Sequence, residues 1–159
     1  MGRVAYALAT GLGAGFVPIA PGTAGSAEGV AIFLAIFLFR LGRTGLLLVL
    51  AILNACIFIV GVWSSTRTCE ITGLKDPRRV VIDEVSGQLI ALTPFAFFPL
   101  SAAGVVAGFL LFRLFDIFKP YPIRKLERLH AGLGVMADDL LAGIYAAVLL
   151  CVGHLARLI

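Results

Sequence analysis

The stretch "TPFAFFPLS", residues 93–101, lies inside a long apolar segment that covers residues 85–112, and it decides how that segment folds. Pro94 and Pro99 each remove a backbone N–H donor and obstruct helix continuation, and the residue before each proline is pushed out of the helical region. The segment is also too long for one simple membrane span. We therefore expect two helices that form a hairpin, joined near Pro99 and Ser101.

The composition around this stretch is typical of an integral membrane protein. Of the 159 residues, 60% are hydrophobic and only 14% are charged. A water-soluble domain of this size needs far more polar surface to cover its core. The length suits one domain over residues 1–159. We expect an all-α, polytopic helical integral membrane protein.

Three further apolar segments are candidate membrane spans. They run from about Ser26 to Phe39, from Gly45 to Trp63 and from Leu140 to Leu155. With the proline-broken hairpin, they give about four to five membrane helices. The second helix of the hairpin also carries Gly104 and Gly108, a spacing that allows close helix contact, although a chain with 18 glycines can produce it by chance.

The hairpin determines which polar residues meet. An unbroken span would place Asp83 and Glu84 on the opposite side of the membrane from Asp116, whereas a full second crossing and a shallow re-entrant turn both return the chain to the same side. The distribution of basic residues agrees with this hairpin, because nine of them then lie on the side of these acids and three on the other. The nine are Arg67, Lys75, Arg78, Arg79, Arg113, Lys119, Arg124, Lys125 and Arg128, and the three are Arg40, Arg43 and Arg157. The positive-inside rule then predicts that the first side faces the cytoplasm.

Five of the nine acidic residues lie at the margins of apolar segments. They are Asp83, Glu84, Asp116, Asp138 and Asp139. Acidic residues that begin a helix can simply favour its dipole or cap it, and both adjacent pairs are expected at helix starts. Ionisable groups near hydrocarbon are nevertheless costly and are functional candidates by default. Because converging carboxylates repel one another, and because Mg²⁺ prefers carboxylates, water and a shared phosphate, we expect these five to form a magnesium site and to act in catalysis.

A charged stripe is predicted in "FRLFDIFKPYPI", residues 112–123. Arg113, Asp116 and Lys119 follow one another at steps of three, so on a helix they would share one face. Arg113 and Lys119 would neutralise a substrate phosphate. Arg78 and Arg79 could add positive charge, although membrane topology is the slightly better explanation of their placement.

A glycine-rich loop is predicted in "APGTAGSAEG", residues 20–29. Thr23 and Ser26 lead into a helix, where free backbone N–H groups and hydroxyls form an anion site. We expect both to contact the phosphate, although a plain turn before a membrane helix explains the loop by itself.

Several familiar chemistries lack their motifs here. The chain has no aspartyl-phosphate DxD pair, no phosphohistidine motif pair and no signature of CDP-alcohol phosphotransferases. The three cysteines are widely spaced and suggest neither a disulfide nor a zinc site. The basic residues are scattered among apolar spans, which argues against a nucleic-acid partner. Metal-assisted hydrolysis remains, with a carboxylate as general base.

Four blocks occur in the order "PGTAGS", "DPRRVVIDEVSGQLIA", "FRLFDIFKPYPI" and "GLGVMADDLLAGIYAA". Together they resemble the phosphatidylglycerophosphatase A family over nearly the whole chain. The resemblance implies a magnesium-dependent lipid phosphatase of the bacterial inner (cytoplasmic) membrane, which converts phosphatidylglycerophosphate to phosphatidylglycerol and inorganic phosphate. The positions that match the family blocks are Thr23, Ser26, Asp83, Glu84, Asp116, Lys119, Asp138 and Asp139.

An alternative from another class is a small ion-coupled membrane transporter that uses the same carboxylates. Such a protein would more naturally place acidic residues mid-span, on broken helices. The expected position of these acids at span ends favours chemistry on a lipid headgroup. A CDP-alcohol phosphotransferase would share the membrane, the magnesium and the lipid, and only its missing signature argues against it.

Overall fold

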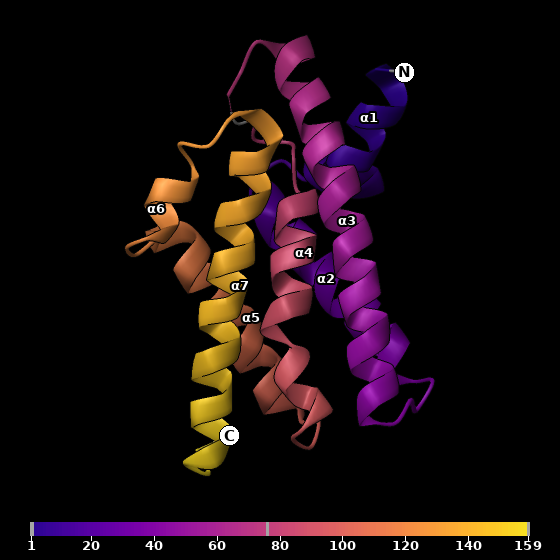
Figure 1. The fold of residues 1–159 in the computed structure, drawn as a ribbon, viewed down its shortest axis with the longest axis vertical. Coiled ribbons are helices and arrows are strands. Elements are labelled where there is room, and N and C mark those ends of the chain that lie inside the picture. Colours follow the sequence, from indigo (N-terminus) through magenta and orange to yellow (C-terminus); the bar gives the residue numbers. More distant parts are fainter. Residues whose placement is uncertain (1, 76, 159) are drawn as a thin grey trace.

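The structure is a computed structural model that describes residues 2–75 and 77–158, and these residues form helices and connections without a strand (Figure 1). The elements in chain order are α1 (Gly2–Ala9), the 3-10 helix η1 (Gly11–Phe16), α2 (Pro21–Phe37), α3 (Arg43–Thr72), α4 (Ile82–Ala91), the 3-10 helix η2 (Thr93–Ala96), α5 (Ala102–Phe118), α6 (Ile123–Leu126) and α7 (Ala131–Leu155). The prediction of an all-helical chain is confirmed for the described residues.

Two helices, α3 with 30 residues and α7 with 25, are long and apolar enough to cross a membrane. Both are longer than the spans expected from sequence, since α3 continues to Thr72 and α7 already begins at Ala131. Asp138 and Asp139 were expected to begin a helix, but they lie two turns inside α7. Capping therefore does not explain them. The expectation of four to five membrane helices stays a prediction, because α2 and α5 have only 17 residues each, below the roughly 20 that a span needs.

The break at the prolines is confirmed. Helix α4 ends at Ala91, η2 contains Pro94, and α5 begins only at Ala102. The Ser101 hydroxyl caps α5 by accepting a hydrogen bond from the Gly104 N–H at 3.0 Å. Helix α5 then runs back beside α4, which returns the chain to the end of the molecule where α4 starts (Figure 1).

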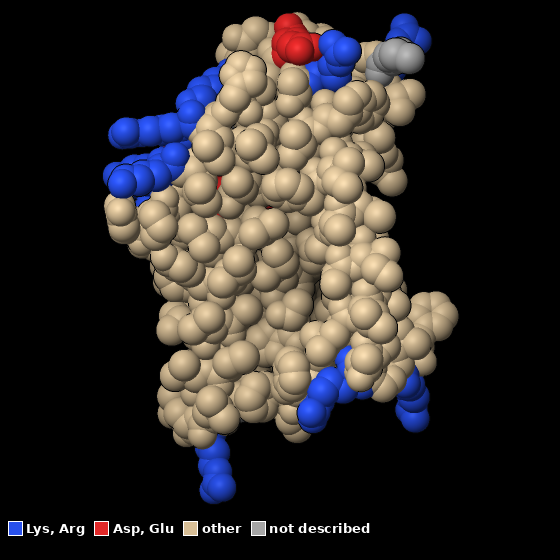
Figure 2. All heavy atoms as spheres, viewed as in Figure 1, with Lys and Arg blue, Asp and Glu red and all other residues tan. Residues whose placement is uncertain are grey.

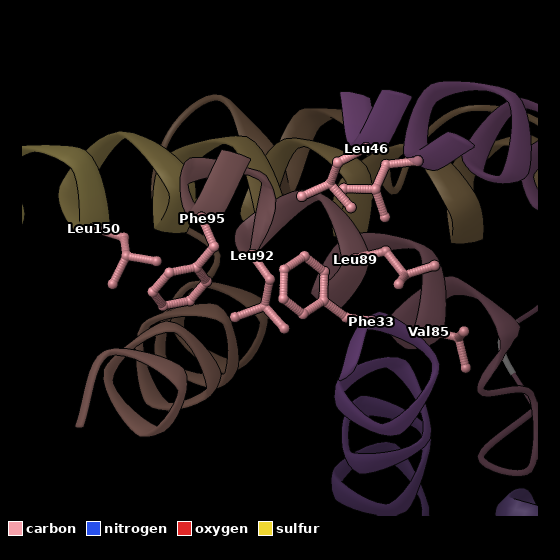
Figure 3. Packing of buried hydrophobic residues seen from close by; sticks show 8 residues of the cluster. Phe33, Leu46, Val85, Leu89, Leu92, Phe95 and Leu150 are labelled. Atoms are coloured by element: carbon pink, nitrogen blue, oxygen red, sulfur yellow. The ribbon is translucent and has the colours of Figure 1, made fainter. Parts of the chain in front are cut away.

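Helix α4 is the centre of the fold. It contacts α2, α3, α5 and α7, and eight of its ten residues are buried. The largest apolar cluster surrounds its second half and the following η2 (Figure 3). Its buried members are Phe33, Leu46, Leu50, Val85, Leu89, Leu92, Phe95 and Leu150. The first turn of α4 lies beyond this cluster and carries Asp83 and Glu84.

The surface has an apolar belt. On the face in Figure 2, Lys and Arg side chains gather toward the two ends of the long axis, and the broad band between them consists almost entirely of uncharged residues. Large apolar side chains are exposed on several helices, for example Ile59 of α3 (70%), Leu110 of α5 (58%) and Val152 of α7 (53%). Such a continuous apolar surface marks an interaction site, and with two helices of membrane length it indicates membrane association.

Candidate active site

The site is built where α4 and α7 cross. A Cβ atom added at Gly143 of α7 would overlap the carbonyl oxygen of Gly87 in α4, and one added at Gly87 would lie 2.6 Å from the carbonyl oxygen of Asp139. The two backbones therefore meet at van der Waals distance. Asp83 precedes Gly87 by four residues and Asp139 precedes Gly143 by four, so each carboxylate lies one turn from the crossing, on the contact face. The glycine pair thus brings two acids from distant parts of the sequence together.

Asp83, Glu84 and Asp139 form a trio suited to a metal ion. Each offers one carboxylate oxygen, and these oxygens all lie within 4.8 Å of one another. Asp83 is only 8% exposed and Asp139 only 3%.

Part of this carboxylate network lacks a partner. Among the described residues, Glu84 Oε2 and Asp139 Oδ2 are buried and have no hydrogen-bond partner. Buried carboxylates carry a large desolvation cost unless a cation or a donor compensates them. Hard cations such as Mg²⁺ take oxygen ligands of this kind. The three carboxylates, with two buried oxygens that lack a hydrogen-bond partner, therefore fit a divalent cation.

The trio opens onto a polar cavity of about 120 Å³. The cavity is lined by Arg78, Val80, Asp83, Glu84, Asp116, Lys119, Val135, Asp138 and Asp139. All five acidic residues singled out from the sequence are present, together with two cationic side chains. The structure thus brings these five together from α4, α5 and α7, while their catalytic and metal-binding roles stay predictions.

Lys119 bridges two acids at the cavity wall. Its Nζ donates to Asp138 Oδ2 and to Glu127 Oε1, both at 2.6 Å. Burial by itself lowers the pKa of Lys119, but the hydrogen bonds with Asp138 and Glu127 outweigh this effect and raise the pKa well above its ordinary value. The ammonium group therefore stays charged and holds Asp138 in place.

The predicted charged stripe is only partly correct. Arg113 and Asp116 do pair within one helix face, with 2.6 Å between Nη1 and Oδ2. Helix α5 ends at Phe118, however, and Lys119 takes a left-handed conformation (φ 44°) before Pro120. Because Lys119 lies outside the helix, its side chain turns toward α7 instead of continuing the stripe.

The four predicted phosphate-binding residues do not gather around the cavity. Of the four, only Lys119 lines the cavity. Arg113 is held behind it by Asp116 and donates to Ser26 Oγ at 3.4 Å. The expected loop is absent at Thr23 and Ser26, because α2 already begins at Pro21, which is a favourable first helical residue.

Ser26 and Thr23 are accordingly not loop donors. The Ser26 hydroxyl is buried and donates to the Gly22 carbonyl at 2.8 Å, inside α2. Thr23 is exposed and does not line the cavity. Ser26 therefore contacts Arg113 and helps to hold it, whereas Thr23 has no contact that places it in the site.

Two members of the site were not assigned from the sequence. Arg78 lines the cavity, whereas from the sequence membrane topology was the slightly better explanation of its placement. Glu127 pairs with Lys119, and it was not singled out because it lies in the mixed-charge segment "IRKLERLH". In the sequence, Glu127 differs from its neighbours only in being an acid among basic or titratable residues. Acids in such surroundings are common in solvent-exposed turns, so the sequence did not mark it as functional.

The chain is similar in sequence to several known proteins. The sequence profile described as Phosphatidylglycerophosphatase A matches residues 7–154. A protein of Bacteroides thetaiotaomicron, provisionally named a phosphatidylinositol-3-phosphatase, is 41% identical over 92% of this chain and 91% of its own length. Two proteins named phosphatidylglycerophosphatase A are also similar: that of Haemophilus influenzae at 40% identity (90% of this chain, 84% of its own) and that of Escherichia coli at 36% (94% and 83%). No solved structure matches the chain.

Proposed function

The chain belongs to the phosphatidylglycerophosphatase A family, and we propose that it carries out this family's reaction in the carboxylate cavity between α4, α5 and α7. The enzyme is a lipid phosphatase that removes the terminal phosphate monoester of phosphatidylglycerophosphate, giving phosphatidylglycerol and inorganic phosphate. The observation that carries the assignment to this cavity is the meeting of five carboxylates with Lys119 and Arg78 around one small space.

We propose Mg²⁺ as the cofactor, held by Asp83, Glu84 and Asp139. Their oxygens lie within 4.8 Å of one another, and two buried oxygens in the trio have no partner among the described residues. When bound, such an ion neutralises the phosphate and lowers the pKa of coordinated water.

The chain's own groups supply the rest of the chemistry. Lys119 and Arg78 face the cavity and would bind phosphate oxygens. Asp116 and Asp138 lie outside the trio. One oxygen of Asp116 is held by Arg113, and one oxygen of Asp138 is held by Lys119. One of them would accept the proton of the attacking water. A bond forms between water oxygen and phosphorus, the bond from phosphorus to the glycerol oxygen breaks, and that oxygen takes a proton to become the hydroxyl of the product.

We also propose that the apolar belt lies in the bacterial inner membrane, in a multi-pass arrangement, with the cavity facing the cytoplasm. The exposed apolar residues of α3, α5 and α7 support the bilayer contact. The excess of basic residues on the cavity side supports the orientation. The family match favours hydrolysis over ion transport as the use of the buried acids.

A second substrate is favoured by one specific observation, the name of the relative from Bacteroides thetaiotaomicron. Phosphatidylinositol 3-phosphate also presents a phosphate monoester on a polyol headgroup, so the same cavity chemistry would apply. The two lipids differ in the polyol, a difference that the carboxylate cluster alone does not select.

The experiment is phosphate release by the purified protein in detergent, from each of the two lipids, with Mg²⁺ and then with excess chelator. We expect magnesium-dependent release from phosphatidylglycerophosphate, at a higher kcat/KM than from phosphatidylinositol 3-phosphate. The reverse preference would move the substrate to the inositol lipid. Release that survives the chelator would remove the metal from the proposal, and absence of release from either lipid by folded protein would refute the assignment.

A further inference from the structure

A basic groove adjoins the carboxylate cavity. It has a volume of about 420 Å³ and is formed by α6 and the turns on either side of it. Lys119 lines both the cavity and this groove, so the two spaces share a wall. The other charged members of the groove are Arg124, Lys125 and Arg128. Figure 2 shows Lys and Arg side chains projecting from the edge of the molecule where Figure 1 places α6.

Apart from Lys119, the cations of this groove have no acidic partner among the described residues, and two of them are held by hydrogen bonds. Among the residues that the structure describes, no ion pair involves Arg124, Lys125 or Arg128. Lys125 donates to the Tyr121 hydroxyl at 3.2 Å and lies 4.8 Å from the centre of its ring. Arg124 reaches the Phe118 carbonyl at 3.5 Å. Three adjacent positive charges without partners are complementary to an anion, and Arg in particular matches the geometry of a phosphate.

An apolar groove continues from the basic one. It has a volume of about 730 Å³, runs between α5 and the second half of α7, and is lined by side chains that include Leu110, Leu114, Leu149 and Val152. Phe118 lines both this groove and the basic one. The three spaces are therefore neighbours in the order carboxylate cavity, basic groove and apolar groove, with Lys119 lining the first two and Phe118 lining the last two.

This order equals the order of chemical groups in the lipid. From its polar end, phosphatidylglycerophosphate presents a phosphate monoester, a glycerol, a phosphodiester and then the acyl chains. We propose that Arg124, Lys125 and Arg128 bind the phosphodiester of the substrate, and that the groove between α5 and α7 takes one of its acyl chains. This inference rests on the proposed function. The basic groove then selects monoesters that carry a second phosphate one polyol away, a feature shared by both candidate lipids.

The first test compares wild type with Arg124→Gln/Arg128→Gln and with a control, Arg40→Gln, whose exposed arginine lies in the connection between α2 and α3. The substrate is phosphatidylglycerophosphate in micelles of an uncharged detergent. The diester contact is the same in ground state and transition state, so its loss raises KM and leaves kcat nearly unchanged. We expect KM to rise about tenfold or more in the double variant and to stay constant in Arg40→Gln.

A binding measurement separates this inference from the proposed function. The dissociation constant of phosphatidylglycerol, which has the diester but no monoester, is measured in the same micelles without turnover. It should rise by a similar factor in the double variant. Unchanged binding and KM would overturn the basic groove even if wild type is an active phosphatase. An effect seen only on anionic vesicles, and absent in uncharged micelles, would assign these residues to bilayer attraction and would likewise overturn it.

A second pair of variants tests the apolar groove. Val152→Phe would fill the groove, whereas Val106→Phe makes the same change at a similarly exposed position of α5 (56% against 53%) that does not line it. We expect Val152→Phe to raise KM several-fold for a long-chain substrate and not for a six-carbon-chain analogue, and Val106→Phe to change neither. Equal effects of the two variants would refute the groove as an acyl site.

Discussion

At the scale of single residues, Asp139 is the acid whose position is hardest to explain without a cation. It lies two turns inside α7, is 3% exposed, and keeps Oδ2 without a partner among the described residues. It also faces Asp116 and is near Asp83, so three acids share one low-dielectric space. A buried carboxylate with these neighbours destabilises the fold unless positive charge is supplied. Metal binding at the trio would supply it.

Asp139→Asn tests this explanation. We expect activity to fall about 100-fold or more, since even residues that only support metal ligands cost about 10- to 100-fold when changed. In wild type, Mg²⁺ should raise the temperature of thermal unfolding, because a ligand that binds only the folded state stabilises it. In Asp139→Asn that rise should be much smaller. Both quantities are measured in detergent, by phosphate release and by a thermal scan with and without Mg²⁺.

Glu70→Gln is the matched control. Its side chain is 55% exposed and, within the part of the chain that the structure describes, forms an ion pair only with Arg67 on the surface of α3, where an ion pair contributes little. It should keep both the activity and the thermal response to Mg²⁺. A full response in Asp139→Asn would contradict the assignment of this residue to the metal.

At the scale of elements, the crossing of α4 and α7 fixes the distance between the acids. Two helices can bring backbones this close only where neither carries a side chain at the contact, as at Gly87 and Gly143. On α5 the glycines make room for side chains instead, because a Cβ at Gly108 would lie 2.9 Å from the Leu92 side chain and one at Gly104 would lie 2.9 Å from the Phe95 ring. Gly104 and Gly108 therefore lie where α5 packs against η2 and the end of α4, and the predicted close approach of two helix backbones at this pair stays a prediction.

Gly143→Ala should separate the two helices. The added methyl group would overlap the Gly87 carbonyl oxygen, and overpacking of this kind typically costs about 1–3 kcal/mol of stability. Displacing Asp139 from Asp83 by about 1 Å would cost roughly 100-fold in rate. We expect a lower unfolding temperature and a lower kcat, measured on the same preparation.

Gly45→Ala provides the comparison for that variant. Gly45 is also inside a helix, α3, but a Cβ there meets only the Leu41 Cβ at 3.3 Å. The change should leave activity intact and should be neutral or slightly stabilising, because alanine has the higher helix propensity. If Gly143→Ala behaves in the same way, the crossing does not set the geometry of the site.

At the scale of the whole molecule, the hairpin of α4 and α5 gathers the chemistry at one end. The start of α4, the end of α5 and the first turns of α7 all meet there, and α6 covers one side of it (Figure 1). The apolar belt occupies the middle of the long axis on the visible face (Figure 2). In the proposed membrane arrangement, a lipid headgroup would reach the acids at the membrane surface while its acyl chains stay in the bilayer.

The orientation of the whole molecule can be tested by thiol labelling. In a background with Cys56, Cys69 and Cys151 replaced, Arg128→Cys marks the cavity end and Arg40→Cys marks the opposite end. With a reagent that does not cross the inner membrane, applied to cells with a permeable outer membrane, we expect Arg40→Cys to react and Arg128→Cys to react only after lysis. The opposite pattern would invert the proposed topology.

The sequence by itself determined the class of fold, the proline break and the identity of the five acids. Each of these follows from a property that needs no partner: long apolar runs favour helices, proline lacks a donor wherever it lies, and carboxylates beside hydrocarbon are costly in any fold. The order of the four sequence blocks pointed to the family for the same reason, because the residues can be compared without knowing their contacts.

Only the tertiary structure decided which groups touch. Lys119 reaches Asp138 and Glu127 because α5 stops one residue before it, and Arg113 turns to Asp116 and Ser26 because it is still helical there. Thr23 is exposed because α2 begins at Pro21. Side-chain direction depends on where a helix ends and on what packs against it, and a helix end shifted by one residue turns a side chain by about 100°. For that reason the five acids and Lys119 could be chosen from the sequence, whereas their partners could not, and neither could the absence of Thr23, Ser26 and Arg113 from the cavity lining.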